Sequence, residues 1–315
     1  MENKNKLAKA VMDEVKKVVV GKEDVIELVM ASIVANGHIL VEDVPGVGKT
    51  TMAVAFSKAM GIQEKRVQFT PDIMPSDLTG FSMYDKATGQ FVYQPGALMC
   101  NLFLADEINR TSPKTQSALL QVMEERKITV DGKTRIPGNP FIVMATQNPE
   151  GSAGTQLLPE SQLDRFMICI NMGYPTVEEE AEILKRRQEN HTTEEVETVL
   201  EGSDILAMQE EARKIYMSDE IFTYIAKLAE ATRNNNMVAM GISPRGTVAL
   251  AAMSRAKAWL QGRDYVIPED VHNIFFPVAR HRIQRTLKAK VGNVTIEQIL
   301  EQVFGAVEAP EIRKK

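Results

Sequence analysis

The chain has 315 residues, of which 44% are hydrophobic and 25% are charged, a composition that excludes disordered and fibrous classes. Its net charge of −5 makes general nucleic-acid binding a poor explanation, although a local basic patch stays open. The two cysteines, Cys100 and Cys169, lie in apolar segments and are interpreted as reduced core residues, not as a disulfide or a metal site.

The amino-terminal stretch MENKNKLAKAVMDEV is polar and lacks the apolar segment of a signal peptide. No stretch approaches the roughly 18 unbroken apolar residues that a membrane helix needs. We therefore expect a cytoplasmic protein with no membrane insertion.

In the first part of the chain, short apolar runs alternate with helical stretches and with turns rich in Gly and Pro. Apolar runs of about four to six residues without alternation predict strands buried on both faces, as in a parallel sheet between helices. The predicted strands are HILVEDV (38–44), LFLADE (102–107), PFIVMAT (140–146) and RFMICI (165–170).

Two β-hairpins are also predicted in this part. Residues 81–93 hold two apolar-rich runs around a turn that contains Gly89. In residues 127–136, Asp131 and Gly132 stand between alternating residues, which is a strong signal for a two-residue turn. Each hairpin is explained equally well as decoration of an edge and as a loop that projects towards a partner.

Later in the chain the pattern is almost wholly helical. Ser218 is expected to open one helix, and Pro268 to start another. Ser243 and Pro244 form a good N-cap and first-turn pair for a third helix, which lies between the other two in the chain. These signals predict a compact group of helices after the strand-containing part.

The predicted fold class is therefore α/β with two domains. Residues 1–195 are expected to form an αβα sandwich around a parallel sheet, and residues 196–315 a smaller all-helical domain. The length of the chain also favours two domains over one.

The segment EDVPGVGKTT joins an apolar strand to a helix through a Gly-rich loop, which is the context of a phosphate-binding loop. Gly46 and Gly48 allow backbone N–H groups to turn inward around phosphate oxygens, next to the positive end of the helix. Lys49 can reach the β- and γ-phosphates, and the hydroxyl of Thr50 can ligate Mg²⁺.

Asp43 stands where the usual G-x-x-x-x-G-K-T pattern has its first glycine. Asp tolerates unusual backbone angles better than most residues, and this position is the farthest from the lysine. We therefore expect nucleotide binding to survive the change.

Two strand ends carry polar residues that suit nucleotide hydrolysis. Asp106 ends one apolar strand and fits the residue that holds Mg²⁺, while the adjacent Glu107 is placed to polarise the attacking water. Asn148 ends the next strand, where it either touches the γ-phosphate or stabilises a local turn.

Two arginines each allow a structural and a functional explanation. Arg165 lies at a helix end just before an apolar strand, where it can pair with Asp164 or Glu160. Alternatively, Arg165 supplies positive charge to the nucleotide of another subunit. Arg245 lies in the first turn of a helix, where a cation opposes the helix dipole unless an anion such as a γ-phosphate is nearby.

Together these motifs resemble the MoxR family of AAA+ ATPases over nearly the whole chain. The segments that carry the resemblance are VVGKEDVIELVMASIVANGHILVEDVPGVGKT, RVQFTPDIMPSDLTG, LADEINRTSPKTQSALLQVMEE, ATQNPEGSAGTQLLPESQLDRF and GISPRGTVAL. The resemblance implies an AAA+ P-loop αβα sandwich followed by a helical lid, assembled as a hexameric ring.

The resemblance also implies a set of site residues. Those implied to bind ATP are Val20, Gly21, Pro45, Gly46, Val47, Gly48, Lys49, Thr50, Thr51 and Arg245. Those implied to take part in catalysis are Lys49, Glu107, Asn148 and Arg165, and those implied to hold Mg²⁺ are Thr50 and Asp106.

Individual roles follow from the same resemblance. Val20 and Gly21 are similar to the segment that lies against the adenine, and Asn148 is similar to sensor 1. Arg165 is similar to the arginine finger that acts in trans, and Arg245 to sensor 2. The departure at Asp43 puts only the tightness of the phosphate loop in doubt.

The implied activity is hydrolysis of MgATP at subunit interfaces, with a chaperone-like role in remodelling, maturing or activating other proteins. The implied cofactors are ATP and Mg²⁺. The partners are further copies of the chain and a protein client, for example one with a von Willebrand factor A domain. The hairpin at 81–93 resembles the family's helix-2 insert and that at 127–136 its pre-sensor-1 hairpin, which favours substrate handling. Arg110 is a further candidate for contact with a neighbouring subunit.

Two other functions stay open as alternatives. A nucleotide-gated scaffold that does not hydrolyse would lack the water-activating carboxylate, so Glu107 argues against it. A nucleic-acid-remodelling ATPase would use the basic stretch at 277–290. That stretch has no interleaved aromatic residues and is more typical of a subunit-contact surface, so nucleic acid is an unlikely partner. A signalling GTPase and a transporter ATPase are excluded because the N-K-x-D and LSGGQ motifs are absent.

Overall fold

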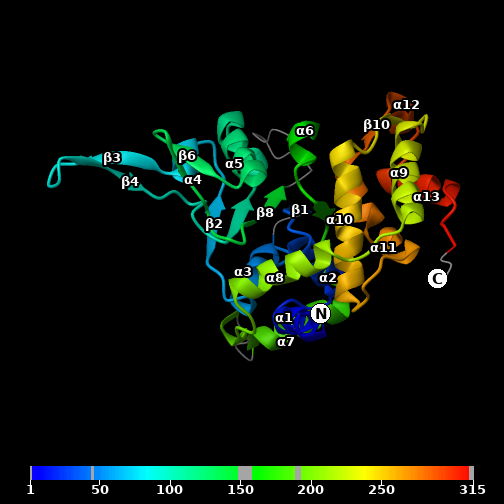
Figure 1. Ribbon diagram of the computed structural model, residues 1–315, viewed down its shortest axis with the longest axis horizontal. Coiled ribbons are helices and arrows are strands. Elements are labelled where there is room, and N and C mark those ends of the chain that lie inside the picture. The colour runs from blue at the N-terminus through cyan, green and yellow to red at the C-terminus, as the bar shows by residue number, and fades with distance from the viewer. Residues whose placement is uncertain (1, 44–45, 148–157, 189–192, 312–315) are drawn as a thin grey trace.

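The computed structural model describes residues 2–43, 46–147, 158–188 and 193–311 (Figure 1). At its centre is a parallel sheet of five strands in the order β2-β5-β8-β1-β9. The strands of this sheet are β1 (Ile39–Glu42), β2 (Glu64–Gln68), β5 (Leu102–Asp106), β8 (Ile142–Gln147) and β9 (Ile168–Ile170).

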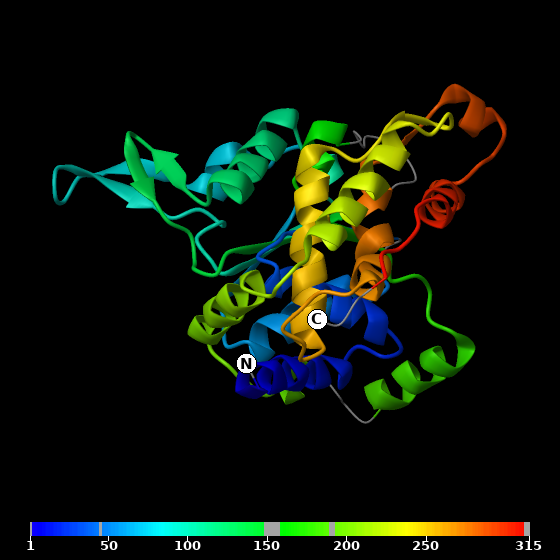
Figure 2. The ribbon, with the colours of Figure 1, turned by 45° about the vertical axis from the view of Figure 1, so that its right-hand side comes forward.

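The helices of the first part surround this sheet. They are α1 (Glu2–Lys16), α2 (Glu23–Val34), α3 (Lys49–Ala59), α4 (Pro75–Thr79), α5 (Pro113–Glu125), α6 (Glu160–Leu163) and α7 (Val177–Gln188), with the 3₁₀ turns η1 (Ile108–Arg110) and η2 (Thr193–Glu195). Figure 2 shows α7 at the lower right, at the outside of the body.

Alternate side chains of each strand enter different cores, because successive residues of a strand point to opposite faces. On one face, Val41 and Leu104 pack with buried residues of α2 and α3. On the other face, Leu40 and Phe103 pack with buried residues of α5. Both faces are therefore covered, which explains why these strands are nearly continuous apolar runs.

Two antiparallel hairpins leave the body of the protein. The first joins β3 (Phe81–Asp85) to β4 (Gln90–Gln94), and the second joins β6 (Ile128–Val130) to β7 (Lys133–Arg135). In the second hairpin, Asp131 and Gly132 have φ angles of 50° and 72°, as the predicted two-residue turn requires. Both hairpins extend to the left of the body in Figures 1 and 2.

The second part of the chain is helical. Its elements are α8 (Gly202–Arg213), α9 (Asp219–Arg233), α10 (Pro244–Leu260), α11 (Pro268–Ala279), α12 (Leu287–Val291), α13 (Ile296–Ala306), the 3₁₀ turn η3 (Arg280–Arg282) and a short strand pair, β10 (Val238–Met240) with β11 (Gln284–Arg285). The long helix α10 runs beside α9 and α11 (Figure 1). Its first turn is capped by Ser243, whose Oγ accepts a hydrogen bond from the N–H of Gly246 at 3.0 Å.

The fold agrees with the predicted α/β class, and all four predicted strands are present in the sheet. The edge strand β2 was not predicted, because its sequence EKRVQ is polar and only partly buried. The predicted helix starts at Ser218, Ser243 and Pro268 are confirmed. The domain boundary at residue 195 stays a prediction.

The sequence predicts no disulfide, no membrane helix and no cysteine metal site, and the described part of the chain bears on each. Cys100 and Cys169 are both buried and free, and burial raises the pKa of the Cys100 thiol to about 12. Within the described ranges, no helix is long and apolar enough to cross a membrane. The same ranges contain no cluster of three or more His, Cys, Asp or Glu side chains that could hold a metal ion.

Candidate functional site

The phosphate loop lies between β1 and α3, at the carboxyl edge of the parallel sheet. Gly46 and Gly48 have φ angles of 90° and 94°, a backbone conformation that L side chains rarely adopt. The helix α3 begins at Lys49, so its first N–H groups face the loop. The Nζ of Lys49 donates a hydrogen bond to the carbonyl oxygen of Asp43 at 2.9 Å. The lysine that is expected to contact phosphate therefore joins the end of the phosphate loop to its start.

Asp43 occupies its position for a reason other than backbone freedom. It is not among the described residues with positive φ. Instead, its buried carboxylate accepts hydrogen bonds from the N–H groups of Met172 at 2.6 Å and Gly173 at 2.7 Å. These residues follow β9, the neighbour of β1 in the sheet. The aspartate thus fastens the start of the phosphate loop to the adjacent strand end, a contact that glycine could not make.

Asp106 ends β5 at the same edge of the sheet, and two side chains hold its carboxylate. The Oγ1 of Thr146, on β8, donates to Oδ1 at 3.0 Å. On the other side, Arg66 of β2 forms an ion pair with Oδ2, with an Nη2–Oδ2 distance of 2.6 Å. The carboxylate therefore has a fixed orientation in a site where only 8% of the residue is exposed.

Glu107 directly follows Asp106 in a left-handed conformation, with φ 56° and ψ 49°. This conformation costs energy for a residue other than glycine and is often found at functional sites. The backbone N–H of Glu107 donates to Thr146 Oγ1 at 2.9 Å, which holds the turn in place. Its carboxylate pairs with Arg110 at 2.7 Å. Arg110 therefore has a partner within its own chain, and its contact with a neighbouring subunit stays a prediction.

These residues surround a cavity of about 310 Å³ at the carboxyl ends of β1, β5 and β8. The lining residues that carry its chemistry are Gly46, Gly48, Lys49, Thr50, Thr51, Arg66, Asp106, Glu107 and Thr146. Burial lowers the pKa of Lys49 from its usual value, while the nearby carboxylates of Asp43, Asp106 and Glu107 act in the opposite direction. A polyanion that entered this cavity would supply the lysine with a closer counter-charge.

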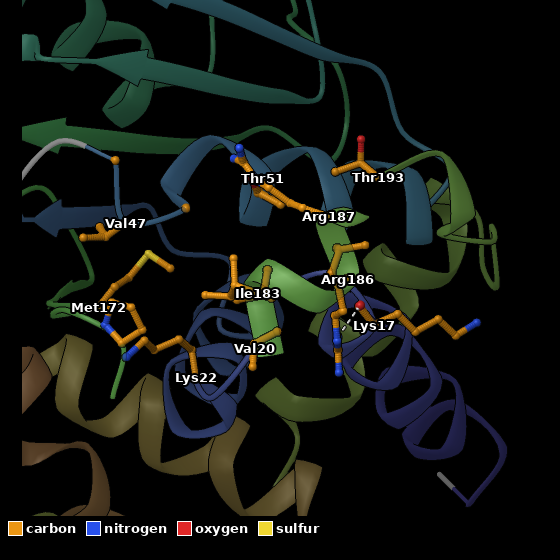
Figure 3. A pocket seen from close by; sticks show the side chains of 15 residues that line it. Lys17, Val20, Lys22, Val47, Thr51, Met172, Ile183, Arg186, Arg187 and Thr193 are labelled. Carbon is orange, nitrogen blue, oxygen red and sulfur yellow. Dashed lines mark hydrogen bonds between the residues drawn. The ribbon is translucent and has the colours of Figure 1, made fainter. Parts of the chain in front are cut away.

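A second cavity, of about 530 Å³, opens on the other side of the phosphate loop. Figure 3 shows Val20, Val47, Met172 and Ile183 around it, with Thr51 at one side. Gly46, Gly48 and Thr51 line both cavities, so the two spaces meet at the phosphate loop. The larger cavity combines apolar side chains with cations such as Lys22 and Arg186, and the smaller one is lined by charged groups, so the pair suits a base and its phosphates.

The helix α7 closes this second cavity from outside. Ile183 and Arg186 of α7 line it, and Arg186 Nη1 donates to the backbone carbonyl of Lys17. Gly21, which was predicted to lie against the base, is not among the lining residues. It has a φ of 67°, and a Cβ at this position would collide with the side chain of Glu179 on α7. Gly21 thus permits the close approach of α7.

The donors present fit a nucleotide with Mg²⁺. Mg²⁺ prefers hard oxygen ligands and is usually bound by one or two protein groups together with substrate phosphates. Thr50 and Asp106 both line the charged cavity and offer one hydroxyl and one carboxylate. Gly46 leaves open space where a Cβ would stand, so the loop can approach phosphate oxygens with its backbone.

Arg165 and Arg245 lie apart from both cavities and share one partner. Arg165, which follows α6, has its Nη2 3.3 Å from Oε2 of Glu124 on α5. The Nη2 of Arg245, in the first turn of α10, lies 2.5 Å from Oε1 of the same carboxylate. Among the described residues, the buried Nε of Arg165 has no hydrogen-bond partner. The structure therefore places the two arginines together, and it pairs Arg165 with Glu124 instead of Asp164 or Glu160.

The other predicted site residues divide into two groups. Val20, Val47 and Thr51 line the cavity of about 530 Å³, and their contact with ATP stays a prediction. Pro45 and Asn148 lie outside the described residues, so their predicted roles are not addressed by the structure. The basic stretch at 277–290 is partly internal, because His281 and Arg282 are buried. The expectation that it forms a contact surface is therefore wrong for these two residues.

Sequence reasoning missed three residues that shape the site, namely Arg66, Glu124 and Thr146. Thr146 could have been found, because it stands next to the carboxyl end of a predicted strand beside Asp106. Arg66 lies on a strand that the hydrophobic pattern did not predict. Glu124 is one of several charged residues at the end of an amphipathic helix, and nothing in the local sequence distinguishes it.

Comparison with known proteins gives two family matches. The model "ATPase family associated with various cellular activities (AAA)" matches residues 38–168, which include both phosphate-site carboxylates and Arg165. The model "AAA lid domain" matches residues 230–303, which include Arg245. Both matched regions thus contain residues identified above from their geometry.

Similar proteins match the chain over nearly its full length. The uncharacterized protein YeaC of Bacillus subtilis (strain 168) is 46% identical over 304 residues, which cover 96% of this chain and 95% of YeaC. Chaperone MoxR1 of Mycobacterium tuberculosis is 38% identical over 308 residues, which cover 95% of this chain and 81% of that protein. A crystal structure of a candidate ATPase from Cytophaga hutchinsonii is similar with a TM-score of 0.91 and 36% identity, covering 98% of this chain and 96% of that one.

Proposed function

The chain belongs to the MoxR family of AAA+ ATPases and is an ATPase, and we propose that it hydrolyses MgATP at sites shared by adjacent copies in order to remodel client proteins. The observation that carries the proposal is the separation of two sets of residues. The binding residues and the water-activating Glu107 line joined cavities, whereas Arg165 and Arg245 lie together on Glu124. A single copy therefore has a nucleotide site without these two cations.

Within one copy, the residues of the charged cavity divide the work of hydrolysis. Thr50 and Asp106 would hold Mg²⁺, which when bound supplies positive charge at the β- and γ-phosphate oxygens. Lys49 adds a second positive charge from the first turn of α3. Glu107 acts as the general base that orients and activates the attacking water. Asn148 is proposed to position the same water.

The two arginines complete the site of a neighbouring copy. Charge develops on the transferred phosphoryl group in the transition state, and an arginine supplied in trans stabilises that charge. The side chains of Arg165 and Arg245 are 29% and 45% accessible. Since one carboxylate already gathers both cations, a phosphate group of the neighbouring copy could replace it. We propose a closed hexameric ring, in which every copy gives and receives these residues.

The client is proposed to be a protein that contacts the hairpin β3–β4. This ribbon exposes Phe81, Met83, Tyr84 and Phe91, and Phe91 is 73% accessible. The rings of Tyr84 and Phe91 contact each other edge to face, with centroids 5.5 Å apart. Phe81 and Met83 lie on one face of the ribbon and Tyr84 and Phe91 on the other, so both faces present apolar side chains. Exposed apolar surface marks interaction sites in proteins. A similar protein is named a chaperone, which supports a protein client, such as one with a von Willebrand factor A domain.

The proposal is tested by measuring the ATPase rate per copy across a range of protein concentrations. We expect the rate to rise with concentration, because the site needs a neighbour. We expect Arg165→Ala to reduce the plateau by about 10³- to 10⁵-fold, the range measured for arginine fingers. Arg213→Ala is the matched control, since Arg213 is an exposed arginine that, among the described residues, forms an ion pair with Glu210 of its own helix.

The opposite outcome would contradict the inter-subunit mechanism. A rate per copy that is independent of concentration and unchanged in Arg165→Ala would show a site contained within one copy. The inter-subunit mechanism would then be wrong, although the assignment as an ATPase would stand.

A further inference from the structure

Asp164 stands directly before Arg165 and binds side chains from two other elements, α10 and η3. The Oγ of Ser243 donates to Asp164 at 3.0 Å from Oδ1 and 2.8 Å from Oδ2. The Nε of Arg282, in the turn η3, donates to Oδ1 of the same carboxylate at 2.7 Å. Ser243 is also the N-cap of α10, so a single hydroxyl joins the start of α10 to Asp164.

Arg282 extends the same connection through a buried space. Only 2% of its side chain is exposed. Its Nη2 donates to the carbonyl oxygens of Asp164 at 3.1 Å and of Phe166 at 2.6 Å, and its Nη1 donates to that of Met167 at 3.2 Å. It also lies against the first turn of α10, where a Cβ on Gly246 would stand 2.7 Å from Arg282 Cδ. One side chain therefore binds the backbone on both sides of Arg165 and touches the helix turn that carries Arg245.

We propose that Asp164, Ser243 and Arg282 form a clamp that fixes Arg165 and Arg245 as one unit, which is presented to the terminal phosphate of a nucleotide on an adjacent copy. Arg165 is the next residue after Asp164, and Arg245 follows Ser243 by two positions. The two guanidinium groups already converge on one carboxylate, that of Glu124. The inference rests on the proposed inter-subunit site and adds the residues that position its cations.

The clamp has a physical purpose because arginine side chains lose much rotamer freedom when they are fixed. A catalytic group helps only when it is held close to its productive geometry, and a misplacement of about 1 Å can cost about 100-fold in rate. Fixing the backbone beside each arginine sets the position from which its side chain extends, so less freedom has to be lost when the neighbouring nucleotide arrives. Asp164 and Arg282 are thus positioning residues that act through Arg165 and Arg245.

The test uses two kinds of full-length chain that are inactive alone. The acceptor carries Arg165→Ala and Arg245→Ala, so it retains a complete binding site but cannot serve a neighbour. The donor carries Glu107→Gln, so it cannot hydrolyse but retains both arginines. Mixing them should restore ATPase activity at the interfaces where a donor serves an acceptor.

Asp164→Asn is then added to one partner at a time. In the donor, we expect it to lower the restored rate by about 10- to 100-fold, because the arginines that it positions are used there. In the acceptor, it should not lower the restored rate further, because both arginines are already absent. This asymmetry is the signature of positioning, and a general loss of folding would not produce it.

Each of the remaining outcomes would contradict the inference for a different reason. Equal loss in donor and acceptor means that Asp164 only supports the fold. Full activity with the donor variant means that the arginines need no clamp, although the inter-subunit site stands. If the unmodified donor and acceptor fail to restore activity, the inter-subunit site itself is wrong, and the clamp falls with it.

Asp270→Asn in the donor is the matched control. Asp270 is 2% exposed and binds Arg263 with both carboxylate oxygens, so it is also a buried Asp–Arg pair of the helical part. The Asp270–Arg263 pair meets α10 at its far end, where the N–H of Arg263 donates to Ala258, and not at the first turn that carries Arg245. We expect a loss of thermal stability from this variant, measured by the unfolding temperature, without a loss of the restored ATPase rate.

Discussion

The nucleotide side and the arginine side of this protein are built differently. At the nucleotide side, Asp106 and Thr146 are buried, and strand-end groups bind one another across the carboxyl edge of the sheet. At the arginine side, Arg245 and its partner Glu124 are each 45% exposed. The described residues of the first region bind one another within one chain, whereas the second holds cations against a carboxylate that solvent can reach. This difference is the basis of our proposal that one copy binds nucleotide alone but needs a neighbour for rapid hydrolysis.

The nucleotide side and the arginine side also differ in which residues are held by hydrogen bonds. On the nucleotide side, the site residues themselves are held by hydrogen bonds, as Asp43 is by the N–H groups of Met172 and Gly173. On the arginine side, the buried contacts belong to Asp164 and Arg282, which flank the arginines. The arginine tips thus stay accessible while their backbones are fixed, as a surface that must meet another molecule requires.

A large effect is expected from Glu107→Gln on the nucleotide side. The amide keeps the shape of the side chain but cannot accept a proton from water. General-base catalysis contributes about 10²- to 10⁴-fold, so we expect the ATPase rate to fall by that factor. ATP affinity, measured by titration with a fluorescent ATP analogue, should stay within about threefold of the parent value.

Arg110→Gln separates the two roles that Glu107 could have. It removes the ion-pair partner of Glu107 but leaves the carboxylate in place. We expect a much smaller decrease in rate than from Glu107→Gln. If both variants lose activity equally, the ion pair and not the base is essential, and the water-activating role of Glu107 is wrong.

The nucleotide side was predictable from sequence because its residues are close along the chain and depend on local turns. The loop around Gly46 and Gly48 needs positive φ, and the pattern strand–loop–helix shows in the order of apolar and Gly residues. The buried strands were predictable for a similar reason. The edge strand β2 was not, because it is only half covered and its sequence is polar.

The arginine side could be predicted only in part. Arg165 and Arg245 were identified by their motifs, but their shared partner Glu124 lies 41 residues before Arg165 and 121 before Arg245 in the chain. No local pattern encodes a contact of that separation. For the same reason, Arg282 was interpreted as part of a basic surface, although it is buried beside Asp164.

Asp43→Gly tests whether the nucleotide side depends on the departure from the usual phosphate-loop pattern. The substitution restores the common glycine but leaves the buried N–H of Met172 without its acceptor, whereas the N–H of Gly173 keeps Oδ1 of Asn171 at 2.6 Å. An unsatisfied buried donor costs about 1–3 kcal/mol, so we expect the free energy of unfolding to fall by about 1–3 kcal/mol. Urea unfolding measures this change.

Asp43→Asn is the control for that experiment. The amide oxygen can still accept from Met172 and Gly173, so the loss of stability should be clearly smaller than with glycine. A glycine variant as stable as the parent would mean that the two hydrogen bonds contribute nothing net. The aspartate would then be an incidental replacement in the loop.

The smallest effect is expected from Glu124→Gln, which tests whether the arginine side differs from the nucleotide side in being incomplete within one copy. Its carboxylate pairs with both guanidinium groups, and under the proposed mechanism it competes for them with a neighbouring phosphate. Exposed ion pairs contribute about 0.2–1 kcal/mol, so Glu124→Gln should raise the ATPase rate at limiting protein concentration by about 1.4- to 5-fold. Glu125→Gln is the control, because Glu125 accepts a hydrogen bond from Gln121 and binds neither arginine in the contacts described. A fall in rate would show instead that Glu124 helps to orient the arginines, so that the arginine side, like the nucleotide side, is preassembled within each copy.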